Sequence, residues 1–80
     1  MNIKVLGSGC SKCNKLAEKV HSLIDANGIT AEVEKITDIP TIMKYGVLST
    51  PALVINEKVK VYGHIPSDKD ILAWISEELA

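Results

Sequence analysis

The 80-residue sequence has no arginine, no long hydrophobic run and little net charge, and each of these absences excludes a class of partner. All nine basic residues are lysines, and the net charge is −1. Arginine supplies the planar guanidinium that recognises phosphate, so we expect no nucleic-acid partner. No apolar stretch approaches the ~20 residues that a transmembrane helix needs, so we expect no membrane partner.

We also expect no leader segment, because the sequence passes directly from Met1-Asn2 into a strand-like run with no basic region before it. We therefore expect a cytoplasmic protein, in which thiols are kept reduced and a close cysteine pair is catalytic or metal-binding rather than structural. A chain of this length suffices for one domain with a modest core. We expect residues 1–80 to form a single domain and the protein to be a monomer.

The sequence has only two cysteines, and both stand in the segment Gly7-Ser8-Gly9-Cys10-Ser11-Lys12-Cys13, between an apolar run and the start of a helical pattern. A disulfide that closes so short a loop stabilises a fold by roughly 2 kcal/mol, against about 3 kcal/mol for a fifteen-residue loop. Such a pair is better suited to opening and closing than to holding a fold. The spacing therefore predicts thiol–disulfide chemistry.

Hydrophobic patterns predict seven elements in the order βαβαββα. The first and third strands are mostly apolar, as in the centre of a sheet, whereas the second and fourth alternate between apolar and polar residues, as at its edges. We therefore predict a four-stranded mixed sheet in the order 2-1-3-4, flanked by three helices of 3.6-residue periodicity. The expected strands cover residues 2–6, 30–36, 52–55 and 58–62, and the expected helices cover residues 11–27, 38–46 and 67–79.

Two details of these elements are also predicted. Asp38 and Ser67 precede the second and third helices with the spacing of N-cap residues. In the fourth strand, alternation predicts that Val59 and Val61 share one face while Lys58 and Lys60 share the other.

A CxxC pair that opens the first helix of a βαβ unit is typical of a thioredoxin-like redox motif. Together with Gly46-Val47, Ser49-Thr50-Pro51 and Gly63 before the last helix, this motif makes the whole chain resemble the small redox-active disulfide proteins of the thioredoxin superfamily. The resemblance implies a thioredoxin-like α/β fold of glutaredoxin size. It also implies a dithiol–disulfide oxidoreductase without cofactor or bound metal, acting on disulfide-containing protein substrates and recharged by an unidentified reductase or thiol donor.

The positions of the two cysteines predict different roles. Cys10 stands at the helix N-terminus, where the helix dipole and unpaired backbone N–H groups stabilise a thiolate, so we expect it to be the nucleophile. Cys13 lies one turn later on the inward stripe of the helix, so we expect it to be shielded and to resolve the mixed disulfide. Ser11 and Lys12, between the cysteines, are candidate modulators, since Lys12 adds positive charge. The first strand carries no carboxylate beneath Cys13, where thioredoxins bury one.

Thr50 and Pro51 form the second predicted part of the site. Proline cannot donate a hydrogen bond to a sheet, yet Pro51 stands at the mouth of the most apolar strand. A trans bond at a strand start is the ordinary alternative, but the resemblance predicts a cis Thr50–Pro51 bond beside the cysteines. Such a bond would leave the polar groups of Thr50 free to bind an extended substrate.

Other interpretations remain open at this point. Cys10 and Cys13 could bind a metal ion, as in heavy-metal-associated domains, although one CxxC supplies only two of four zinc ligands and His64 is the only plausible third. Those domains require the order βαββαβ and have no use for Thr50-Pro51. A redox-regulated binding protein without turnover is a third interpretation. His21 and His64 are expected on the surface, and three lysines of the first helix form either a docking face or a solvated one: Lys12, Lys15 and Lys19.

Overall fold

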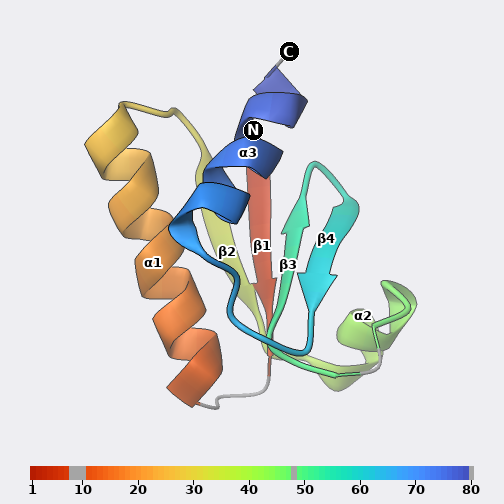
Figure 1. Cartoon of the computed structure of the whole chain (residues 1–80). Helices are drawn as coiled ribbons and strands as arrows, with labels where there is room; N and C mark the ends of the chain where they lie inside the picture. The colour runs from red at the N-terminus through yellow and green to blue at the C-terminus, as the bar shows by residue number, and fades with distance from the viewer. Residues whose placement is uncertain (8–10, 48, 80) are drawn as a thin grey trace.

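The computed structural model describes residues 1–7, 11–47 and 49–79, and the order of its elements is the predicted βαβαββα (Figure 1). Both central strands and the first helix have the predicted bounds. The strands are β1 (Asn2–Leu6), β2 (Glu32–Ile36), β3 (Ala52–Ile55) and β4 (Lys58–Tyr62), and the helices are α1 (Ser11–Asn27), α2 (Ile39–Lys44) and α3 (Asp68–Leu79).

The four strands form one mixed sheet in the order β2-β1-β3-β4, as predicted. β1 is parallel to β2 and antiparallel to β3, and β3 is antiparallel to β4. A parallel pair needs a long crossover connection, and α1 supplies it between β1 and β2. The central position of β1 and β3 explains why their side chains are mostly apolar, because both faces of each strand are covered.

The sheet buries side chains on both faces. Alternate residues of β1 and β3 contribute to two clusters, with Ile3 and Leu53 in one and Leu6 and Val54 in the other. The first cluster packs against α1 and α3, which lie next to one another in Figure 1, and the second packs against Ile42 of α2, which lies apart from them. The first cluster thus fixes α1 against one face of the sheet.

β4 differs from the predicted alternation. A β-bulge opposite Leu53 and Val54 shifts the register, so that Val61 pairs with Leu53 and Val59 pairs with Val54. Val61 therefore packs against the α1 and α3 cluster, while Val59 belongs to the other face and is exposed. The prediction that both valines share a face was wrong because a bulge adds one residue to the strand and reverses the alternation beyond it.

The helix starts follow the predicted caps. The Asp38 carboxylate accepts the Thr41 N–H at 3.1 Å, and the Ser67 hydroxyl accepts the Asp70 N–H at 3.2 Å. α2 is shorter than predicted and buries only Ile42, because Ile39 and Met43 point to solvent. Within the parts of the chain that are described, no helix combines the length and apolar character needed to cross a membrane.

Candidate active site

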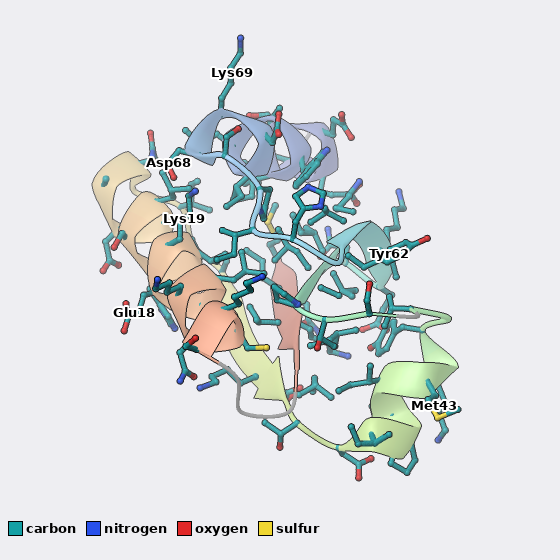
Figure 2. The ribbon with its side chains drawn as sticks, turned by 60° about the horizontal axis from the view of Figure 1, so that its bottom comes forward. Glu18, Lys19, Met43, Tyr62, Asp68 and Lys69 are labelled. Atoms are coloured by element: carbon teal, nitrogen blue, oxygen red, sulfur yellow. The ribbon has the colours of Figure 1, made fainter. Side chains whose placement is uncertain are left out.

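Four strand ends meet at one end of the sheet, and α1 begins there. Leu6 of β1 pairs with Ile36 of β2 and Ala52 of β3, and Ala52 pairs with Tyr62 of β4. This end of the sheet lies at the bottom of Figure 1 and is turned forward in Figure 2. These four paired residues are neighbours in space, and so are the loop residues next to them, although the sequence separates them by up to 56 positions.

Cys13 faces this end of the sheet from the first turns of α1. Its side chain is 1% exposed, which confirms the predicted shielding. The sulfur lies directly against the backbone of Gly7, so closely that a Cβ atom on Gly7 would overlap it. Cys13 is thus enclosed between α1 and the end of β1.

The partner cysteine of the motif, Cys10, lies outside the described residues, so its predicted position stays a prediction. Ser11 and Lys12, the two residues between the cysteines, form the exposed start of α1. Directly after Cys13, the Asn14 side-chain oxygen accepts a hydrogen bond of 2.5 Å from Nζ of Lys35 in β2. This bond ties the first turn of α1 to the edge of the sheet.

The Thr50–Pro51 peptide bond is cis, as predicted. Pro51 is buried and immediately precedes β3, which begins at Ala52. Its carbonyl oxygen accepts the N–H of Gly63 at 2.9 Å, which joins this segment to the end of β4. The Cβ of Thr50 lies 3.8 Å from the point where a Gly7 Cβ would stand, and the Cys13 sulfur overlaps that point from the side of α1. Thr50 and Cys13 therefore approach Gly7 together.

The loop between β4 and α3 borders the Thr50–Pro51 segment. Gly63 has a φ of +91°, and a Cβ there would lie 2.8 Å from the Ser49 hydroxyl, so only glycine fits. Lys19 holds the other end of this loop: its Nζ donates to the Pro66 carbonyl at 2.7 Å and lies 3.4 Å from the Asp68 carboxylate (Figure 2). Lys19 is therefore engaged within the molecule rather than being simply a solvated or docking residue.

Sequence reasoning missed Gly7 and Lys19. The only available signal for Gly7 was its place before the CxxC motif, since glycine there is equally consistent with an ordinary turn. For Lys19 there was no signal, because helical spacing places it on a polar face and says nothing about a loop 47 residues away. Both residues act through tertiary contacts.

The opposite face of the sheet carries a separate polar group. Nζ of Lys4 contacts Glu57 at 2.6 Å and donates to the Tyr45 hydroxyl at 2.9 Å. The hydrogen bond from Lys4 is the main reason that the pKa of Glu57 is lowered. A shallow pocket of about 280 Å³ beside this group is lined by Thr41, Lys44, Tyr45 and Glu57. It includes none of the predicted site residues.

Within residues 1–7, 11–47 and 49–79, no three His, Cys, Asp or Glu side chains are grouped closely enough to hold a metal ion. His21 and His64 are both exposed, as predicted. The observed order βαβαββα also differs from the βαββαβ order that the heavy-metal-associated interpretation requires.

The family model and the two relatives that match this sequence are all described as thioredoxins. Residues 1–76 match a family model described as a thioredoxin domain. The chain is 31% identical to a thioredoxin from Methanothermobacter thermautotrophicus, over 95% of this chain and 99% of that protein. It is 36% identical to a thioredoxin from Methanocaldococcus jannaschii, over 86% of this chain and 79% of that protein.

Solved structures share the fold. Thioredoxin 1 from the thermophilic eubacterium Thermosipho africanus superimposes with a TM-score of 0.65 at 20% identity, covering 99% of this chain and 94% of that chain. The germline-specific thioredoxin Deadhead from Drosophila melanogaster superimposes with a TM-score of 0.62 at 17% identity, covering 95% and 78%. The sheet and its helices are thus arranged as in these thioredoxins.

Proposed function

The chain belongs to the thioredoxin family and is a thiol–disulfide oxidoreductase, and we propose that Cys10 and Cys13 form its redox-active dithiol. Cys10 is the nucleophile in this proposal, and Cys13 resolves the intermediate. The observation that carries the assignment is the burial of Cys13, whose side chain is 1% exposed. A thiol enclosed between α1 and β1 cannot meet a protein disulfide directly, but it can react with a sulfur that stands three residues earlier at the helix start.

The reaction proceeds in two exchanges. The Cys10 thiolate attacks one sulfur of a substrate disulfide, forms a mixed disulfide and releases the first substrate thiolate, which takes up a proton. Cys13 then loses its proton and attacks the Cys10 sulfur, which forms the Cys10–Cys13 disulfide and releases the second substrate thiolate, again protonated. In sum, the substrate disulfide gains two electrons and two protons, and the protein dithiol loses them.

Placement at the start of α1 favours the thiolate of Cys10. The first N–H groups of a helix have no partner within the helix, and the helix dipole places partial positive charge there. Thiols at helix N-termini have pKa values lowered into the range of roughly 3.5–7.5. Lys12 adds a full positive charge in the first turn, and Ser11 adds a hydroxyl, so both are candidate modulators.

We also propose that Thr50 and Pro51 bind the substrate backbone. Pro51 has no N–H, and its carbonyl is already used by Gly63. Thr50 is half-buried and lies beside Gly7, the residue that the Cys13 sulfur contacts. Its backbone groups are therefore placed to pair with an extended segment of the substrate next to the scissile disulfide.

The partners follow from the same chemistry. Thioredoxins use disulfide substrates and a reductase partner, and we propose that this chain reduces protein disulfides and is recharged by a reductase or thiol donor. We propose further that it is cytoplasmic, because a reducing compartment keeps the dithiol in its active form. We also propose that it is a monomer of one domain.

A reductase assay tests this proposal. With dithiothreitol as donor, the wild type should accelerate the reduction of insulin disulfides, and Cys10→Ser should give only the rate of dithiothreitol alone. Circular dichroism spectra should be alike for the two proteins. Equal rates for wild type and Cys10→Ser would refute the assignment, and stoichiometric zinc in an inactive wild type would favour the metal-binding interpretation of Cys10 and Cys13.

A further inference from the structure

Gly7 is held in place by the sheet. Its N–H donates to the Ile36 carbonyl at 2.9 Å, which extends the β1–β2 ladder by one residue, and its neighbour Leu6 is fully buried and paired with strands on both sides. Among the described glycines, positive φ angles occur at Gly28, Gly46 and Gly63, but not at Gly7. The backbone conformation at Gly7 is therefore one that L-residues with an N–H group adopt, so its conformation does not require glycine.

The space around Gly7 does require glycine. A Cβ atom at this position would overlap the sulfur of Cys13 and would lie 2.9 Å from the Cβ of Cys13. The Cβ of Thr50 would be 3.8 Å away, in ordinary contact. A single methyl group at Gly7 thus collides with the resolving cysteine while leaving the substrate-binding segment unaffected.

Rotation of the Cys13 side chain cannot relieve both collisions. Turning χ1 moves the sulfur but leaves the Cβ where the helix backbone places it. That backbone is anchored by Leu16 and Val20, which are fully buried against the sheet. Since Gly7 is fixed as well, an added methyl group must both turn the sulfur away and displace the start of α1.

We infer that Gly7 is a positioning residue, whose missing side chain sets the place of the Cys13 sulfur for its attack on Cys10. This inference rests on the proposed function. Disulfides form only within a narrow geometry, with Cβ atoms about 3.5–4.5 Å apart, so a displaced Cys13 closes the Cys10–Cys13 bond poorly. The step affected is the second exchange, in which the Cys10–substrate bond breaks and the substrate thiolate leaves with the proton that Cys13 gave up.

Single-turnover kinetics test the inference. Reduced protein is mixed with a synthetic peptide disulfide dimer, quenched in acid at intervals and analysed by intact mass. In Gly7→Ala the Cys10–peptide mixed disulfide should accumulate and decay about ten- to a hundredfold more slowly than in wild type, the range expected for an ångström-scale displacement of a reacting group.

Gly28→Ala is the matched control. Gly28 follows the far end of α1 and has a φ of +62° with nothing within 4 Å of an added Cβ, so alanine there strains the backbone without touching the site. Its mixed disulfide should decay as in wild type. If the wild type turns over and Gly7→Ala decays at the wild-type rate, the positioning role is wrong and the proposed function stands. If the wild type forms no mixed disulfide at Cys10, the proposed function itself fails, and the positioning role fails with it.

A second measurement covers the case in which Gly7→Ala folds poorly. Urea denaturation of Gly7→Ala, Cys13→Ala and the double variant forms a double-mutant cycle. Removing the sulfur should relieve part of the collision, so Gly7→Ala should cost less stability in the Cys13→Ala background than alone. Strictly additive losses would show that the two side-chain positions do not meet, which would overturn the inference.

Discussion

Cys13 combines the properties of a resolving thiol. It is buried, it lies on the inward stripe of α1, and it touches the backbone at the end of β1. Each of these properties limits the approach of a large molecule to the Cys13 thiol. We therefore expect reagents in solution to react with the Cys10 thiol before the Cys13 thiol.

Limited alkylation tests this difference. With reduced protein at mildly acidic pH, a small excess of iodoacetamide should modify Cys10 first, because the thiolate is the reacting species and Cys13 is shielded. Peptide mass spectrometry gives the order of labelling. In a denaturant the two cysteines should react at similar rates, which is the control, and preferential labelling of Cys13 in the folded protein would reverse the assigned roles.

Some residues of the candidate site could be predicted from the sequence, and others could not. The phase of Cys13 in the helix predicted its burial, whereas the cis Thr50–Pro51 bond was predicted from the resemblance to the thioredoxin superfamily. Gly7 had no such signal, because its φ is ordinary and its constraint comes from a side chain six residues away on another element. A requirement for empty space becomes visible only when the packing is known.

Among the elements, β4 and α3 are joined by a charged cluster that the bulge creates. Because the bulge turns Lys60 toward α3, its Nζ lies 3.0 Å from the Glu78 carboxylate, and the two side chains are only 12% and 9% exposed. The hydrogen bond from Lys60 is the main cause that lowers the pKa of Glu78, and the same bond is the main cause that raises the pKa of Lys60. This cluster fixes the end of α3 on the hairpin.

Glu78→Gln should make the stability of the protein less dependent on acid pH. A carboxylate whose pKa is lowered in the folded state stabilises that state above its ordinary pKa of 4.5, and the contribution is lost as the pH falls through the folded pKa. The wild type should therefore exceed Glu78→Gln in free energy of unfolding at about pH 7, and the difference should shrink at about pH 3. Urea denaturation at both pH values measures it.

Glu77→Gln is the control for this comparison. Glu77 is 63% exposed and lies 3.5 Å from the same lysine, so solvent screens the pair and its removal should matter less. A difference between wild type and Glu78→Gln that stays constant between the two pH values would contradict the assigned role of Glu78.

The order of the elements could be predicted from the sequence. Which side chains of β4 and α2 face the core could not always be predicted. Helix starts carry their own caps at Asp38 and Ser67, and these were correctly identified. The bulge in β4 depends on the partner strand and has no marker in a sequence of alternating lysine and valine. In α2, Ile39 and Met43 are exposed because this six-residue helix meets the sheet through Ile42 alone.

Across the whole molecule, stability depends on the two central strands. All four residues of β3 are fully buried, and Leu53 joins the sheet to the cluster under α1 and α3. The order 2-1-3-4 was predictable for this reason, since continuous apolar strands must lie between alternating ones. The same strands carry Gly7 and Pro51 at their ends, so the core also positions the site.

Leu53→Ala should therefore cost a large share of the total stability. Truncation of a buried leucine destabilises proteins by about 2–5 kcal/mol, against a total of about 5–15 kcal/mol for a typical domain. Urea denaturation of the reduced proteins gives the difference. Val59→Ala, on the edge strand and 36% exposed, is the control and should cost less than about 1 kcal/mol. Equal losses for the two variants would contradict the two-sided burial of β3.

The most direct test of the central claim is the covalent state of the two serine variants after exposure to a disulfide. Reduced Cys13→Ser and Cys10→Ser are each mixed with a peptide disulfide dimer and analysed by intact mass. Cys13→Ser should hold one peptide on Cys10 as a stable mixed disulfide, because the resolving thiol is gone, and Cys10→Ser should stay unmodified because Cys13 is buried. A stable adduct on Cys13, or none on either variant, would contradict the assignment of Cys10 as nucleophile and Cys13 as resolving cysteine.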